Sequence, residues 1–177
     1  MANISGKKAL MIIAPKNFRD EELFHTKEEI EKAGGAVTIA STTVGQATGM
    51  FGATANPNIT IDSANVDEYD VIIFVGGGGS EIYFENPRAL QIARDAYSKN
   101  KLVTAICIAP SILANAKLLQ GRSATVWAGD KKYVGILERN GAKFTGKSVQ
   151  VDGRIITANG PEAARKFGAT IVKNLSK

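Results

Sequence analysis

The chain has 177 residues, of which 44% are hydrophobic and 22% charged, and its formal net charge is +5. This composition and length predict one globular domain over residues 1–177, and no apolar run approaches the ~20 residues of a membrane span. One cysteine and one histidine argue against an intramolecular disulfide, a zinc hydrolase or a Ser-His-Asp enzyme. The polar start lacks a secretory pattern, so we expect a cytoplasmic protein. We expect neither a metal nor a cofactor. Basic residues beyond position 100 are scattered singly without alternating aromatics, which argues against nucleic-acid binding.

The first half of the chain alternates short apolar runs with helical patterns. The acidic segment 17–22 suits the positive N-terminus of a helix, and Gly34-Gly35 would end that helix. In chain order we expect a strand at 7–14, a helix to Ala33, a strand at 36–40, a small β excursion over 43–62 and a strand at 71–75 that runs into four glycines.

The second half continues this alternation. In chain order we expect a helix at 87–98, a strand at 102–106, a helix from 108 to 119, a strand at 123–128, a helix from 130 to 140, two or three strand-like pieces within 144–158 and a helix at 161–175. Alternating strands and helices predict a doubly wound, flavodoxin-like α/β domain with a mainly parallel sheet covered on both faces.

Three segments whose residues could take part in catalysis or binding follow the predicted strands directly. They are Asn17–Glu22 after the first strand, Gly76–Gly79 after the third and Cys107 after the fourth. Ligands of open α/β sheets bind beyond the carboxyl ends of the strands. We therefore expect these segments to converge into one site.

Cys107 lies between a predicted buried strand and a helix that begins near Pro110. A residue in such a strand-to-helix turn resembles the serine of a nucleophile elbow, and the helix N-terminus would lower the pKa of the thiol. The alternative is a buried cysteine that serves as a small hydrophobic residue. Position alone leaves both interpretations open.

The glycines at 76–79 also allow two interpretations. A phosphate loop is not supported, because the third glycine of that motif is replaced by Glu81. The amides of a tight turn could instead stabilise an oxyanion next to Cys107, although a purely structural turn fits equally well.

Glu22 has a structural and a catalytic interpretation. Acidic residues in the first turn of a helix often only favour the helix dipole. If Glu22 instead points inward at Cys107, the carboxyl and the thiol would hold one proton between them, and a protonated Glu22 would donate to the sulfur.

These residues resemble the ThiJ/PfpI superfamily, which includes PfpI-type intracellular proteases, the Parkinson-disease-associated protein and class I glutamine amidotransferase-like domains. The matches are Glu22 before Lys32-Ala33-Gly34, the segment 71–77, and the elbow AICIAP at 105–110, where Ala109 replaces the usual glycine. The resemblance implies Cys107 as nucleophile, Glu22 as its partner and an oxyanion hole at Gly76-Gly77 and Ile108.

Both histidines familiar from the superfamily are absent. PfpI-type proteases have a histidine directly after the nucleophile, where this chain has Ile108, and the Parkinson-associated branch has one on the following strand, where this chain has Trp127. Trp127 is expected to wall the pocket with apolar surface. His25, three residues after Glu22, is the one candidate replacement, although a lone histidine is more often a packed or surface residue.

The resemblance favours an enzyme that acts on small reactive carbonyls, as glyoxalase or deglycase-type members do, through a Cys107–Glu22 pair. The alternatives are an intracellular cysteine peptidase or amide hydrolase, a redox-sensing, stress-protective protein through Cys107 oxidation, and a non-catalytic scaffold. The expected partners are a small carbonyl or peptide substrate and further copies of the chain in a homodimer or hexamer.

Overall fold

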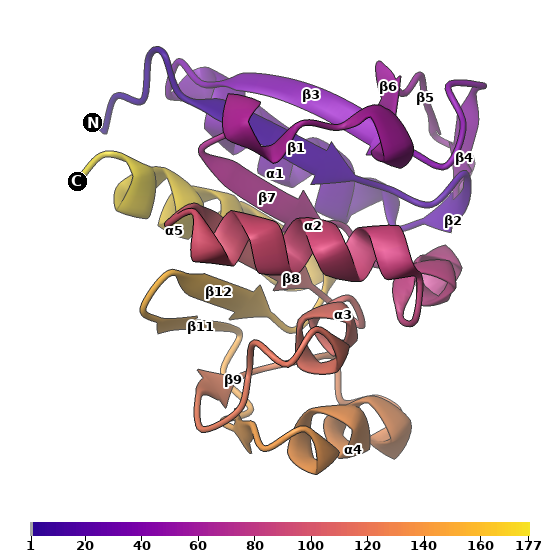
Figure 1. Cartoon of the computed structure of the whole chain (residues 1–177). Coiled ribbons are helices and arrows are strands. Elements are labelled where there is room, and N and C mark those ends of the chain that lie inside the picture. The colour runs from indigo at the N-terminus through magenta and orange to yellow at the C-terminus, as the bar shows by residue number, and fades with distance from the viewer. Residues whose placement is uncertain (1) are drawn as a thin grey trace.

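The computed structural model describes residues 2–177 and consists of a central sheet with helices on both faces (Figure 1). The sheet has seven strands, which in spatial order are β11 (Val149–Asp152), β12 (Ile155–Ala158), β8 (Leu102–Ile106), β7 (Val71–Phe74), β1 (Lys8–Ile12), β3 (Ala36–Ser41) and β6 (Ile59–Thr60). Only the β11–β12 pair is antiparallel. The mainly parallel, doubly wound α/β fold is thereby confirmed.

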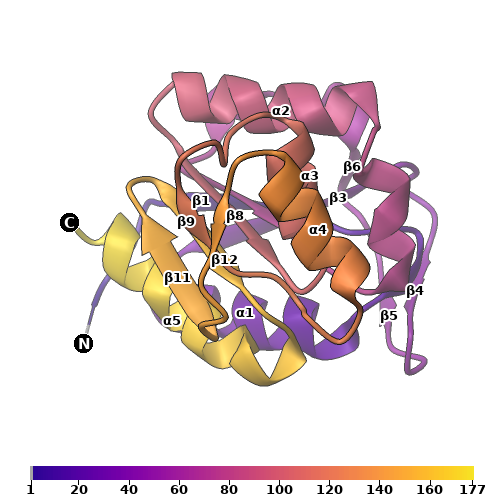
Figure 2. The same cartoon turned by 90° about the horizontal axis from the view of Figure 1, so that it is seen from below.

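Five α-helices surround this sheet. They are α1 (Asp20–Lys32), α2 (Pro87–Ser98), α3 (Pro110–Asn115), α4 (Lys131–Arg139) and α5 (Ala164–Leu175). Figure 2 shows α1 and α5 on one side of the sheet and α2 on the other, while α1 packs against α5 and α3 against α4. Because both faces are covered, β7 and β8 are buried at every position, and their residues are apolar except for Thr104 in β8.

Two small sheets and four 3-10 helices complete the fold. One small sheet joins β2 (Lys16–Phe18), β4 (Ala47–Gly49) and β5 (Thr54–Ala55), and the other joins β9 (Ser123–Ala124) and β10 (Lys143–Phe144). The 3-10 helices are Ile61–Ser63, Val66–Glu68, Gly78–Tyr83 and Pro161–Ala163. The expected β excursion over 43–62 therefore supplies one edge strand of the main sheet and a separate hairpin.

Several predicted boundaries were wrong. The helix expected to reach Leu119 is the short α3, because Lys117 adopts a positive φ of 65° and ends it. The strand expected over 123–128 stops at Ala124, since the next amides bond elsewhere: Thr125 N–H donates to Thr157 Oγ1 at 2.9 Å and Trp127 N–H to the Cys107 carbonyl at 2.8 Å.

Across residues 2–177 there is no helix long and apolar enough to cross a membrane.

Candidate functional site

Cys107 occupies a strained turn directly after β8. Its φ of 66° lies in the left-handed region that residues other than glycine rarely adopt. Two backbone hydrogen bonds hold it there: its N–H donates to the Ala158 carbonyl at 2.9 Å, and its own carbonyl accepts from Trp127. The elbow is thus over-determined by the neighbouring segments, as expected where strain serves a function.

Glu22, in the first turn of α1, points into the molecule and is fully buried. Its Oε1 accepts a hydrogen bond from the Gly76 N–H at 3.0 Å. Its Oε2 is buried without a hydrogen-bond partner in the described part of the chain, and the carboxyl lies against the Cys107 thiol. The structure therefore brings the thiol and the carboxyl together, with one carboxyl oxygen left to exchange a proton with sulfur.

Gly76 and Gly77 fill the space between these two side chains and the start of α1. A Cβ on Gly76 would lie 2.5 Å from Glu22 Oε1 and 2.6 Å from the Cys107 Cβ. Gly77 has a φ of 95°, and a Cβ there would lie 2.4 Å from the backbone nitrogen of Arg19. The absence of side chains lets the backbone approach the sulfur, and the amides of Gly77 and Ile108 act to lower the pKa of the Cys107 thiol. The same two N–H groups are placed to hold an oxyanion formed beside the sulfur.

The ionisation of this pair is governed by burial. Burial raises the pKa of Glu22 to about 8, against the lowering effects of the Cys107 thiol and the Gly76 amide. Burial, followed by the charge of Glu22, also raises the pKa of the Cys107 thiol above its ordinary value, while the amides of Gly77 and Ile108 oppose this. The expectation that a helix N-terminus lowers the thiol pKa was wrong, because desolvation outweighs it.

The two groups titrate as one unit. After losing its first proton, the pair retains one proton between Oε2 and Sγ, and carboxylate with thiol and carboxylic acid with thiolate are two microstates of that form. A carboxyl with a pKa near neutrality is well matched to take the thiol proton as sulfur attacks and to return it later. Glu22 is therefore equipped to act as the general base and acid of Cys107.

A pocket of about 250 Å³ opens above the sulfur. Its lining comprises Arg19, Met50, Gly77, Gly78, Cys107, Ile108, Trp127, Tyr133 and Pro161. Four of these residues come from the predicted set, namely Gly77, Cys107, Ile108 and Trp127. The rings of Trp127 and Tyr133 pack with their centroids 6.0 Å apart. The walls are mostly apolar, so the pocket suits a small molecule with few polar groups.

His25 does not line this pocket. It lies in a neighbouring hollow of about 410 Å³ with Glu21, Glu162 and Arg165, and Arg19 and Pro161 separate the two hollows. As a replacement base for Cys107, His25 is therefore misplaced. One turn of α1 carries its side chain past the inward-facing Glu22 toward α5.

Arg19, Met50, Tyr133 and Pro161 were missed as lining residues. Tyr133 lies on α4 and Met50 on the β4–β5 hairpin, and only the tertiary fold carries these elements to the sulfur. Asp20 positions the hairpin, because its carboxylate accepts the N–H groups of Phe51 and Ala53 at 3.1 and 3.0 Å. An acidic residue at the start of α1 was visible in the sequence, but not its partner.

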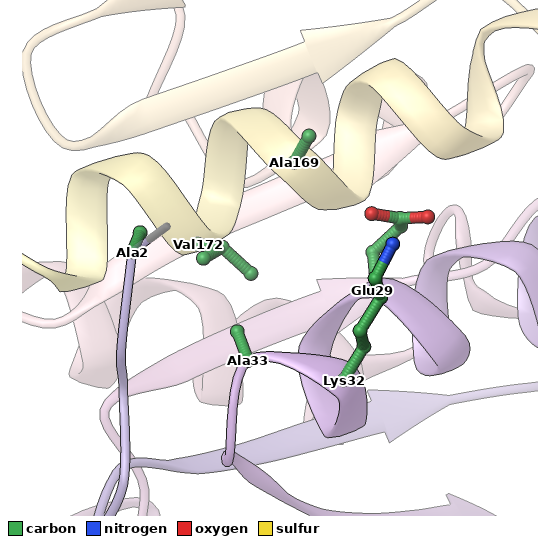
Figure 3. Close-up of a pocket in the computed structure, with 6 residues that line it drawn as sticks. All are labelled: Ala2, Glu29, Lys32, Ala33, Ala169 and Val172. Atoms are coloured by element: carbon green, nitrogen blue, oxygen red, sulfur yellow. The ribbon is translucent and has the colours of Figure 1, made fainter.

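A hollow elsewhere on the molecule lacks such chemistry. Figure 3 shows this hollow between α1 and α5, of about 190 Å³, lined by Ala2, Glu29, Lys32, Ala33, Ala169 and Val172. It contains neither a nucleophile nor a buried carboxyl. Throughout residues 2–177, no three His, Cys, Asp or Glu side chains gather to hold a metal ion.

Replacing Gly76 by alanine is expected to lower the free energy of unfolding by about 1–3 kcal/mol, because the new methyl group overlaps atoms of Glu22, Cys107 and Ile106. Gly78→Ala is the matched control, since its Cβ would meet nothing within 4 Å. Urea denaturation of both variants measures the difference. Equal stabilities would show that the loop has room to spare at Gly76.

The rate of Cys107 alkylation by iodoacetamide is expected to rise with pH and to level off above about 8, where the pair loses its first proton. Labelling is specific because the chain has one cysteine. In Glu22→Gln this inflection should vanish, since an amide does not titrate. An inflection at the same pH in the variant would assign it to another group.

The geometry defines a class: α/β proteins with a cysteine in a strained elbow beside a buried glutamate. The chain belongs to the DJ-1/PfpI family, whose sequence pattern it matches over residues 7–174. It is 41% identical over 99% of its length to a protein of Methanocaldococcus jannaschii, 85% of which is covered. It is 31% identical over 86% of its length to a protein of Pyrococcus furiosus named deglycase PfpI, 90% of which is covered.

Solved structures show the same relationship. A ThiJ/PfpI domain protein from Brachyspira murdochii superposes with a TM-score of 0.91 at 31% identity, covering 96% of this chain and 98% of that one. Drosophila melanogaster DJ-1beta superposes with a TM-score of 0.86 at 27% identity, covering 96% and 90%.

Proposed function

We propose that the protein is a cysteine-dependent enzyme that acts on small reactive carbonyl compounds, as a glyoxalase or deglycase. The observation that carries this proposal is the buried carboxyl of Glu22 against the Cys107 thiol, next to two backbone amides, at the floor of a 250 Å³ pocket. Similarity to relatives named deglycase supports it.

The chemistry starts with addition of sulfur to an aldehyde. The S–C bond forms as the thiol proton passes to Glu22, and the carbonyl electrons move to oxygen, where the amides of Gly77 and Ile108 bind it. Returning the proton from Glu22 to that oxygen gives a hemithioacetal. With methylglyoxal, the hydrogen on the former aldehyde carbon moves to the neighbouring carbonyl carbon and the hydroxyl proton moves to the oxygen of that carbonyl, which gives a thioester of lactate. Water then releases lactate and restores the thiol, so no external oxidant or reductant is consumed.

A peptidase is the second enzymatic candidate, since relatives of the superfamily include intracellular proteases. The described lining of the pocket contains no histidine to protonate an amine leaving group, so Glu22 alone would have to do so. The amide-bond reaction therefore fits this site less well than carbonyl addition.

A redox sensor is the non-enzymatic candidate. The unpartnered Oε2 of a protonated Glu22 would donate a hydrogen bond to a sulfinate on Cys107. The raised thiol pKa and the 9% exposure of Cys107 oppose rapid oxidation, because peroxides react with an accessible thiolate.

A cytoplasmic location and assembly into a homodimer or hexamer stay predictions.

One experiment separates these functions. The protein is incubated with methylglyoxal, and lactate is measured by NMR; the control is the same protein alkylated at its single cysteine. We expect many lactate molecules per chain from the free protein and none from the alkylated one. Cleavage of a fluorogenic peptide without lactate would replace the proposal by a peptidase. If dilute peroxide adds two oxygens to Cys107 and the protein neither forms lactate nor cleaves the peptide, the proposal would be replaced by a redox sensor.

A further inference from the structure

Arg19 lies at the boundary between the Cys107 pocket and the neighbouring hollow, directly before α1. Three contacts hold it. Its backbone N–H donates to the Gly76 carbonyl at 3.0 Å, its Nε donates to Glu21 Oε2 at 2.6 Å, and its guanidinium lies 4.6 Å from the centroid of the Phe51 ring. The cation is therefore oriented before any ligand arrives, which lowers the entropic cost of binding.

The two terminal nitrogens of this guanidinium remain available. Within residues 2–177 only Nε donates a hydrogen bond, and the side chain is 27% exposed. Around it, the pocket is walled by Met50, Ile108, Trp127 and Pro161, and no carboxylate lines it. Glu21 and Glu162 lie on the other side, in the neighbouring hollow. A fixed cation thus faces an apolar cavity that also contains the nucleophile.

We infer that Arg19 is a specificity-determining residue, which binds the carboxylate or phosphate group of an anionic carbonyl substrate while the carbonyl carbon lies at Cys107 Sγ. The carbonyl part of this inference rests on the proposed function. The anion subsite itself rests only on the geometry of Arg19 and the pocket.

The physical argument is one of matched polarity. Two parallel N–H groups of a guanidinium fit the two oxygens of a carboxylate or phosphate, and such charge-assisted bonds strengthen when water is displaced by apolar walls. The carbonyl oxygen of the same molecule would bind the amides of Gly77 and Ile108. One substrate anchored at both ends is held in position for sulfur attack.

The test compares two alkylating agents of nearly equal size, iodoacetate, which is negatively charged, and iodoacetamide, which is neutral. The measured quantity is the ratio of their rates with Cys107 at one pH, followed by mass spectrometry on the intact protein. Arg19→Gln is expected to lower the iodoacetate to iodoacetamide ratio about tenfold, while Arg19→Lys, which keeps the charge but loses the two parallel N–H groups, should lower the ratio only about threefold. The ratio is the quantity compared because it cancels changes in the reactivity of the thiol, which the loss of the Arg19 charge also alters through Glu22.

Two further variants make the test specific. Glu21→Gln should raise the ratio about twofold, because it removes a negative charge beside Arg19 that repels the anionic reagent, while the amide oxygen can still accept from Nε and keep the guanidinium oriented. Arg165 is a cation of the neighbouring hollow and pairs with Glu28 and Glu29. Arg165→Gln should therefore leave the ratio unchanged. An equal ratio in wild type and Arg19→Gln would overturn the inference, as would an equal fall of both rates.

A final arm identifies the oxyanion. Pyruvate and inorganic phosphate are each tested for slowing the iodoacetamide reaction in wild type and in Arg19→Gln. Slowing by pyruvate that the variant loses assigns a carboxylate, and slowing by phosphate assigns a phosphate. These rates do not require turnover, so they would establish the subsite even if the protein released no lactate from methylglyoxal.

Discussion

Replacing Cys107 by serine is expected to lower turnover of 2-oxoaldehydes at least about 1,000-fold. A carboxyl with a pKa of about 8 can take the proton of a thiol far more readily than that of a hydroxyl, whose pKa is several units higher. The variant retains the same backbone contacts to Ala158 and Trp127 and a side chain of similar size. Steady-state lactate formation measures the loss.

The control for this variant is its stability. Urea denaturation should show unfolding within about 1 kcal/mol of wild type, because serine replaces the sulfur without a large cavity. A folded Cys107→Ser protein that retains a tenth of the activity would contradict nucleophilic catalysis by this cysteine and would indicate that the pocket acts through its amides alone.

Replacing Glu22 by glutamine is expected to stabilise the fold increasingly as the pH rises from about 4.3 to 8. The carboxyl keeps its proton to about pH 8 in the folded protein but loses it near 4.3 when unfolded. Between these values the folded state binds more protons, so the free energy of unfolding of wild type falls with pH. Glutamine does not titrate, and its Oε1 can still accept the Gly76 N–H.

The expected gain at pH 8 relative to pH 5 is about 2–4 kcal/mol, measured by urea denaturation at both values. Glu21→Gln is the matched control on the same helix turn. Arg19 lowers the pKa of the half-exposed Glu21 carboxyl. Glu21→Gln should therefore give no gain in the free energy of unfolding between pH 5 and pH 8. A difference between Glu22→Gln and wild type that is constant with pH would show that Glu22 is ionised in the folded protein at pH 5.

The same substitution is expected to reduce turnover, because an amide cannot shuttle the proton of Cys107. A change that raises stability while lowering activity is the behaviour of a residue kept for chemistry at a structural cost. A buried carboxyl with an unpartnered oxygen has no comparable structural justification.

The sequence by itself determined the order of the elements and the likeness of the chain to its superfamily. Apolar runs such as Val71–Phe74 are long enough and apolar enough to predict buried strands, and the glycines and Cys107 at strand ends predict where the edge of the sheet carries chemistry. These signals are local in the chain, so they do not depend on packing. Short pieces such as β2 and the end of α3 were missed, since tertiary contacts and a single positive φ decide them.

Only the tertiary structure decided the protonation of Glu22 and which residues lie near the sulfur of Cys107. Both an inward Glu22 and an outward one satisfy the helical pattern, and burial at the junction with Gly76 is what raises the pKa of its carboxyl. His25 lies on the same helix but is carried away from the sulfur, while Arg19 and Tyr133 are brought to it from positions more than 80 and 20 residues away in sequence. Desolvation and proximity arise from the packing of distant segments, so no local pattern of residues encodes them.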